Sequence, residues 1–291
     1  MRKAEPPPLS VGDTLGKSLR LVLAEGLDHL DAHRTDALAG VPEAIHQARV
    51  ALRRLRSALK LFRRHLNPAA RDGFNDALRG FGRTLGDARD WDVFVTETVP
   101  GVKKAQPGLA DALTTLLEPA ERARMQRHAA MRALLEDART DAVLHDIRDW
   151  SAEPIAFFPR KMAGRLIEQE AAPLLDGLAR TVRRRGSRLP EQDDEERHAL
   201  RKALKSLRYG IEMLEALHDR ETAKPYRQAL SRLQEDLGQL NDAIAAAELV
   251  HRLPDLPGRA VIEAWAADRR QTALEELPAA WTQFRAMPSF W

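Results

Sequence analysis

Residues 46–60 read HQARVALRRLRSALK, and residues 198–212 read HALRKALKSLRYGIE. A second motif also occurs twice, because Leu, Gly and Asp of LGDARDWD at 85–92 recur in LGQLNDAI at 237–244. The offset is 152 residues for both motifs (198 − 46 and 238 − 86). Two motifs that repeat in one register rarely arise by chance. The sequence therefore predicts two copies of one unit of about 150 residues, each with about four helices.

The chain has the composition of an all-α protein. Ala, Leu, Arg and Glu dominate, β-branched and aromatic residues are few, and apolar positions recur at intervals of three and four. Clusters of Gly and Pro punctuate this pattern and predict about eight helices. The expected spans are 9–38, 43–66, 69–98, 109–149, 159–186, 192–219, 222–251 and 258–285.

The composition also excludes several classes of site. The 291 residues contain no cysteine, so disulfides, thiolate zinc sites and cysteine nucleophiles are absent, and a reducing cytoplasm is the expected location. The first residues, MRKAEPPPLS, lack the apolar segment of a signal peptide. No run approaches the roughly 18 apolar residues that a membrane span requires. We expect a soluble protein with no membrane partner.

Positive charge is concentrated in the first repeated motif. The net charge is only +3, but seven Lys or Arg residues and no Asp or Glu lie between Ala44 and Arg71. On a helix, His46, Arg49, Arg53, Arg56 and Lys60 fall within about 80° of one another, directly beside an apolar stripe. In the second copy the matching residues are His198, Arg201, Lys205, Arg208 and, in the fifth place, Glu212. We call the nine basic residues among these ten the basic row.

Two interpretations of the basic row remain open. Carboxylates from another helix could neutralise it, with Asp87, Asp90 and Asp92 as candidates, or an external polyanion could bind there. We favour the anion, because like charges about 6 Å apart repel by roughly 1–3 kcal/mol unless something offsets them. From His46 to Lys60 the row is about 21 Å long, which suits an extended chain of phosphates. If the two copies pack about a pseudo-twofold axis, their rows line a single channel.

These motifs resemble a known family. HQARVALRRLRSALKLF with LGDARDWDVF, and RHALRKALKSLRYGIEML with LQEDLGQLNDA, resemble the CHAD family, the conserved histidine α-helical domain. The resemblance runs from about Leu9 to the C-terminal region. It implies an all-α fold of two pseudo-symmetric four-helix bundle repeats packed around a basic central groove or channel. It further implies binding of inorganic polyphosphate, with no catalytic activity and no cofactor.

The resemblance assigns site residues and boundaries. Residues 1–8 are expected to form a flexible tail, and residues 9–291 a single domain of two repeats, about 9–152 and 153–291. No enzyme domain is expected to be fused to it. Association with polyphosphate granules in the cytoplasm would follow. The expected polyphosphate-binding residues are His46, Arg49, Arg53, Arg54, Arg56, Lys60, His198, Arg201, Lys202, Lys205 and Arg208, supported by Arg89, Asp90, Asp242 and Tyr209.

The roles of some of these residues have two interpretations. The two histidines either donate to phosphate when protonated or orient the arginines. We expect Asp90 and Asp242 to pair with the basic row, the alternative being a divalent cation held with the phosphates. Gly86 and Gly238 either cradle phosphate or, as we favour, permit close helix packing or a bend. The arginine-rich segment 180–188 either reaches the ligand or forms a solvated helix end.

Two other functions compete with polyphosphate binding. A helical nucleic-acid-binding protein would use the same backbone electrostatics, although few aromatic residues interleave with the basic row. A phosphorelay module would carry a transferable phosphate on His46. The sequence shows no HExxH motif, no phosphate-binding glycine loop and no nucleophile elbow, so we expect neither an enzyme nor a metal site. The sequence leaves the oligomeric state undetermined.

Overall fold

The structure, a computed structural model, describes residues 4–291 of the chain and consists of helices and their connecting segments, with no strand in that range. Two isolated bridges are the only β-type pairings among these residues. The expected all-α fold is confirmed. The helices are α1 (Leu15–Leu38), α2 (Pro42–Leu61), α3 (Pro68–Val93), α4 (Val99–Ala105), α5 (Ala110–Thr114), α6 (Leu117–Glu136), α7 (Ala138–Ala152), α8 (Ile167–Gly186), α9 (Asp194–Met213), α10 (Arg220–His251) and α11 (Pro257–Ala286).

Short polar residues define where these helices begin. The side chain of Asn67 accepts a hydrogen bond from the first turn of α3, and Asp219 does the same for α10. Asp193 and Glu196 form a reciprocal capping box at the start of α9. The starts of α1, α2 and α3 recur in α8, α9 and α10 at the same offset of 152 residues as the sequence motifs (167 − 15, 194 − 42 and 220 − 68).

The expected helix at 109–149 is wrong, because this segment forms α5, α6 and α7. The side chain of Asp137 accepts from the backbone N–H of Arg139, which ends α6 and caps α7. The expected helix at 69–98 continues through a π turn at Phe94–Thr98 into α4. Residues 9–14 and 159–166 precede α1 and α8 instead of belonging to them. Within residues 4–291, the first half therefore contains seven α-helices, α1 to α7, and the second half contains four, α8 to α11.

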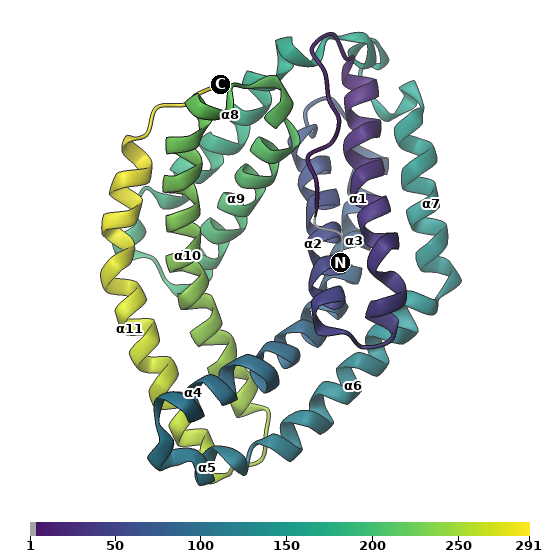
Figure 1. Cartoon of the computed structure of the whole chain (residues 1–291). Coiled ribbons are helices and arrows are strands. Elements are labelled where there is room, and N and C mark those ends of the chain that lie inside the picture. The colour runs from purple at the N-terminus through teal and green to yellow at the C-terminus, as the bar shows by residue number, and fades with distance from the viewer. Residues whose placement is uncertain (1–3) are drawn as a thin grey trace.

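Two hydrophobic cores hold the halves of the molecule together. The larger core includes Leu52, Leu55 and Phe62 of α2 and Leu204 and Leu207 of α9, so that α2 and α9 pack against each other between the halves. The smaller core lies at the opposite end, where α4 and α5 reach the lower ends of α10 and α11 (Figure 1). The halves therefore meet at both ends, with an opening between them in Figure 1.

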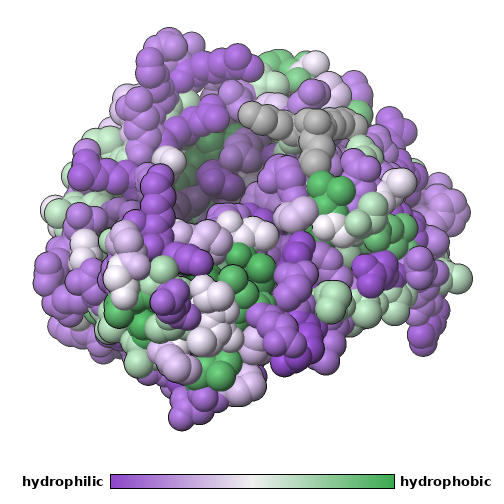
Figure 2. Space-filling model, turned by 60° about the horizontal axis from the view of Figure 1, so that its bottom comes forward, coloured by the Kyte–Doolittle hydropathy of each residue, from purple (hydrophilic) through white to green (hydrophobic). Residues whose placement is uncertain are grey.

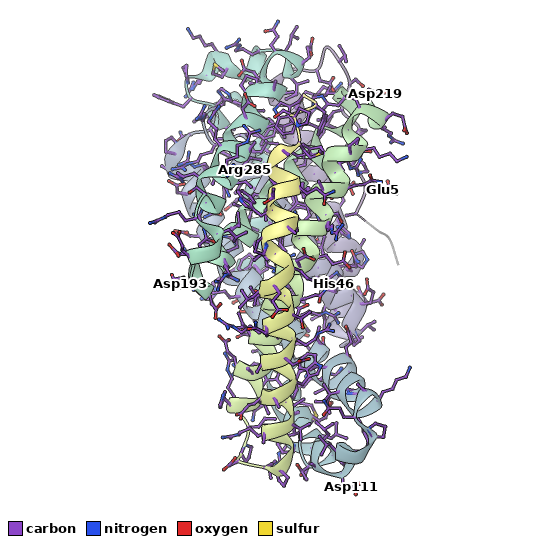
Figure 3. The ribbon with its side chains drawn as sticks, turned by 90° about the vertical axis from the view of Figure 1, so that its left-hand side faces the viewer. Glu5, His46, Asp111, Asp193, Asp219 and Arg285 are labelled. Atoms are coloured by element: carbon purple, nitrogen blue, oxygen red, sulfur yellow. The ribbon has the colours of Figure 1, made fainter. Side chains whose placement is uncertain are left out.

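A glycine permits the close approach at the smaller core. A Cβ at Gly258 in α11 would lie 2.6 Å from the carbonyl oxygen of Ala112 in α5. Any larger residue would push α5 away from α11. In the side view, Asp111 of α5 and Asp219 before α10 lie at opposite ends of an elongated molecule, with His46 between them (Figure 3).

The N-terminal segment lies against the body of the protein where it is described. The first three residues of the expected tail lie outside the described range, and residues 4–8 contain no helix. Pro7 is buried, and the carbonyl oxygen of Glu5 accepts a hydrogen bond of 2.7 Å from Arg54 in α2. No helix within residues 4–291 is long and apolar enough to cross a membrane.

Candidate polyanion-binding cavity

A cavity of about 780 Å³ opens between α2, α3 and α9, with Arg185 at the end of α8 on its rim. The chain is also visibly hollowed in Figure 2, where mostly hydrophilic residues surround the hollow. The cavity lining contains twelve Lys or Arg side chains against three Asp and no Glu. The basic lining residues are Arg49, Arg53, Arg56, Lys60, Arg63, Arg71, Arg79, Arg83, Arg185, Arg201, Lys202 and Lys205.

Most of this charge is not neutralised by the protein. Only three of the twelve side chains form an ion pair with a carboxylate within the described residues, namely Arg49 with Asp90, Arg71 with Asp72 and Arg79 with Asp76. The other nine Lys and Arg side chains share the cavity lining with further basic side chains. Charges in a concave site with low-dielectric walls reinforce one another's field, so the cavity strongly attracts anions.

The repeated glycine and aspartate motif positions the arginines in the middle of the cavity. Arg49 donates to Asp90 at 2.9 Å, and its guanidinium group lies beside Gly86 of α3. Arg201 occupies the same place against Gly238 of α10 and is attracted by Asp242, with no ion pair within 4 Å. The expected pairing of an aspartate with the basic row is therefore seen for Asp90.

Two lysines are held among these arginines. Burial, and then the charge of Arg53, lower the pKa of Lys205 to about 6. Burial, and then the charge of Arg185, lower the pKa of Lys60 to about 8, and the Lys60 ammonium donates to the Ser206 hydroxyl at 3.0 Å. Both shifts mean that the free protein disfavours the charged lysine. A bound anion would reverse that preference.

The motif histidines lie near the N-terminal ends of α2 and α9. Burial, and then the charge of Arg89, lower the pKa of His46, which does not line the cavity. His198 lines the cavity, and its Nδ1 is 3.0 Å from the side-chain oxygen of Asn241. Burial, and then the charge of Lys202, lower its pKa as well. Asn241 stands at the position where the first half has Arg89, so the two histidines have different neighbours.

Comparisons with known proteins agree with this architecture. The family model described as the CHAD domain matches residues 21–251, most of the chain. The chain belongs to the CHAD family. It is similar to the crystal structure of the CHAD domain from the plant Ricinus communis, with a TM-score of 0.78 and 26% identity over 99% of this chain and 97% of that one. No curated protein matches the sequence.

A second solved structure shares the fold of this CHAD domain. It is PptA from Streptomyces chartreusis, with a TM-score of 0.65 and 18% identity over 93% of this chain and 97% of that one. The family match ends with α10 at His251, and both structural matches continue beyond it. The helices that form the cavity all lie within the matched region.

Six of the expected site residues do not line the cavity. They are His46, Arg54, Arg89, Arg208, Tyr209 and Asp242. Arg54 is buried and donates to Glu212 at 3.2 Å and to the carbonyl oxygen of Glu5. Arg208 lies 3.3 Å from Glu212 and over the buried ring of Tyr209, and Arg89 pairs with Glu97 at 2.8 Å. Glu212 therefore supplies compensating charge to Arg54 and Arg208, and Glu97 supplies it to Arg89.

The structure adds cavity residues that the sequence analysis did not select. They come from α3, the end of α2 and the end of α8, and are Arg63, Arg71, Arg79, Arg83 and Arg185. A signal was present in the sequence, because Arg71, Asn75, Arg79 and Arg83 recur at intervals of four and therefore share one helix face. The arginine-rich segment at 180–188 does reach the site, through Arg185.

Other potential chemistry in the molecule lies outside the cavity. Asp92, one of the carboxylates considered as a partner for the basic row, instead accepts from Arg124 at 2.7 Å and contacts His128 at 2.8 Å, both in α6. Within the described range, no group of three His, Asp or Glu residues is arranged to hold a metal ion. No aromatic side chain lines the cavity.

Proposed function

We propose that this CHAD domain binds inorganic polyphosphate, without catalysing a reaction, in the cavity between α2, α3 and α9. The observation that carries the proposal is the basic lining: nine Lys or Arg side chains there have no carboxylate partner among residues 4–291. Arginine donates bidentate, charge-assisted hydrogen bonds to phosphate oxygens, and lysine adds point charges. A chain of phosphates would relieve the repulsion among these cations.

The shape of the cationic surface supports a chain-like anion. The cations extend along successive turns of α2 from Arg49 to Lys60, include Arg63 just after the helix, and continue onto α3 and α9. At a rise near 1.5 Å per residue, the α2 segment alone is about 17 Å long. A single orthophosphate would meet only two or three of these side chains. A polymer with one charge or more per phosphate would meet most of them.

Polyphosphate fits the cavity better than a nucleic acid does. Single-stranded nucleic acids gain much of their affinity by stacking bases on aromatic rings, and no aromatic residue lines this cavity. Both polyanions should show the steep salt dependence of counterion release. We therefore expect polyphosphate to displace single-stranded RNA or DNA at one fixed salt concentration, and displacement in the opposite direction would favour the nucleic-acid alternative.

A double charge reversal tests the proposal. Arg53→Glu combined with Lys205→Glu places two carboxylates in the middle of the cavity, and we expect the Kd for polyphosphate to rise at least tenfold, or about 1.4 kcal/mol. The matched control is Lys224→Glu with Arg232→Glu, which changes the net charge equally on the exposed surface of α10. Titration calorimetry with polyphosphate of defined length measures both. A change of less than threefold in the cavity variant would count against the proposal.

The proposal extends to the setting of the protein. A non-catalytic binder leaves the ligand intact, so incubation with the protein should not change the length of the polyphosphate. Cytoplasmic polyphosphate granules are the setting that such binding favours. A fluorescent fusion should concentrate on granules, and the charge-reversed variant should remain dispersed.

A further inference from the structure

The packing of α2 on α9 leaves a surface on each side of the pair. We call the side formed with α3 the α3 face, and the side formed with α10 the α10 face. Residues separated by 152 positions occupy equivalent places in the two halves, because α2 and α9, and α3 and α10, begin 152 residues apart. The equivalents Arg49 and Arg201, and Arg53 and Lys205, meet in the cavity, whereas Lys60 lines it and Glu212 does not. The two halves can therefore be compared position by position.

The α10 face is neutralised by its own glutamates. Glu212 lies within 3.3 Å of both Arg54 and Arg208. One turn further along, Glu215 lies 3.0 Å from Arg227 and 3.4 Å from Arg220. The equivalents of these two glutamates on the α3 face are Lys60 and Arg63. At both positions the sign of the charge is reversed between the faces.

The α3 face instead carries a connected group of cations. Burial, and then the charges of Arg79, Arg53 and Arg83, lower the pKa of Arg56 against the opposite effect of Asp76. Lys60 is similarly influenced by Arg185, Arg56 and Arg63. The group therefore continues without interruption from the end of α8, along α2, to the middle of the cavity. The only lining carboxylates are Asp72, Asp87 and Asp90.

The surface of α3 between its arginines is bare. Gly82 lines the cavity between Arg79 and Arg83 in sequence, and a Cβ built at this position would meet no atom within 4 Å. Gly86, one turn further along, lines the cavity as well. The open space at Gly82 lets a ligand approach the helix backbone closely, beneath the guanidinium groups on either side.

We infer that the bound phosphate chain lies on the α3 face alone and crosses α3 at Gly82, between the α3 arginines and the basic row of α2. This inference rests on the proposed function and adds the location of the ligand. The α10 face offers no equivalent path, because Glu212 and Glu215 would repel phosphate there. The residues that fix the ligand on one face are Gly82, Arg79, Arg83, Arg56 and Lys60.

A side chain introduced at Gly82 tests the path. Gly82→Leu places an isobutyl group in the open space over α3, and we expect the Kd for polyphosphate to rise at least fivefold. The matched control is Gly73→Leu, an exposed position of the same helix that also has open space around it but does not line the cavity. Both substitutions favour helix formation, so both variants should unfold at or above the wild-type temperature. Only the Gly82 variant should bind more weakly.

A second pair of variants changes charge instead of shape. Arg83→Gln removes an exposed α3-face cation that forms no ion pair within the described residues, and should weaken binding at least threefold. Arg232→Gln removes an exposed cation from α10 and should change the Kd by less than 1.5-fold. If wild-type protein binds polyphosphate while Gly82→Leu and Arg83→Gln bind it equally well, the location is wrong and the proposed function stands. If the wild-type protein does not bind, the proposed function itself fails.

Discussion

Two equivalent contacts between α2 and α9 differ in one essential respect. On the α3 face, Lys60 donates to Ser206 at 3.0 Å; on the α10 face, Glu212 accepts from Arg54 at 3.2 Å. The partners correspond through the 152-residue offset (212 − 60 and 206 − 54). A hydroxyl group satisfies the lysine as a hydrogen-bond donor but leaves its charge. The glutamate cancels the charge of a buried arginine.

The difference shows how one duplicated architecture serves two purposes. The ion pair on the α10 face joins α2 to α9, although burial raises the pKa of Glu212, and Arg54 also donates to the carbonyl oxygen of Glu5 in the N-terminal segment. The α3 face keeps its cations close together at a cost in stability, which is visible in the lowered pKa of Lys60. Unpaired charge retained in a packed interface supports the proposal that the α3 face binds an anion.

The largest effect should come from breaking the ion pair on the α10 face. Glu212→Gln leaves Arg54 buried without a carboxylate, and removing one partner of a buried pair costs roughly 3–5 kcal/mol. Because Glu212 is only partly buried, we expect the free energy of unfolding to fall by about 3 kcal/mol, at the lower end of that range. Urea denaturation measures it. Affinity for polyphosphate should change by less than twofold.

The equivalent substitution on the α3 face should have the opposite profile. Lys60→Gln removes a cation whose charge the folded protein disfavours, so the free energy of unfolding should be unchanged or higher, while the Kd for polyphosphate rises severalfold. The two faces would prove equivalent, and the contrast would disappear, if Lys60→Gln destabilised the protein as much as Glu212→Gln does.

A matched pair of arginines gives the next largest effect. Arg56 and Arg208 occupy equivalent positions (208 − 56 is 152), but Arg56 lines the cavity and donates only to the side chain of Asn75, whereas Arg208 lies against Glu212. Arg56→Gln should raise the Kd for polyphosphate about tenfold, since a charge-assisted hydrogen bond contributes roughly 1.5–3 kcal/mol. Arg208→Gln should raise it less than twofold. Equal losses in calorimetric titrations would place the ligand on both faces.

Much of this arrangement follows from local sequence. The 152-residue repeat, the helical period and the side-by-side apolar and basic stripes of α2 depend only on spacing, and the structure reproduces the repeat in the starts of the helices. Eight of the eleven expected binding residues line one cavity. Which side chains surround a given arginine depends instead on the packing of helices far apart in sequence.

Arg54 and Asp137 show the two kinds of information that spacing did not supply. Arg54 has the residue type of a phosphate ligand but faces Glu212, which is distant in sequence, so only the packing of α2 on α9 decides its partner. Asp137 had a local signal, because aspartate caps helices well, yet the apolar period continues across it and hides the break. Arg71, Arg79 and Arg83 were also visible as a four-residue repeat.

The last prediction is a pH dependence centred on Lys205. Its pKa of about 6 lies below the usual value of 10.5, and the cations facing it are Arg53 and Arg49 from α2 and Arg201 and Arg208 from α9. Between these values the unfolded chain binds more protons than the folded one, so the free protein should become more stable as the pH rises from 6 toward 10. Thermal denaturation without ligand should show this rise.

Binding should follow the opposite trend, because phosphate favours the charged lysine. At pH 8 Lys205 must take up a proton before it can contribute a charge to binding. We therefore expect the Kd for polyphosphate to be about fivefold higher than at pH 6. The increase is limited because, without that proton, binding loses only the charge of one lysine. The lowered pKa values of His46 and His198 act in the same direction. The arginine in the Lys205→Arg variant stays charged at both pH values, so this variant should lose most of the pH dependence of the Kd. An unchanged pH profile in that variant would assign the proton taken up on binding to the histidines instead of Lys205.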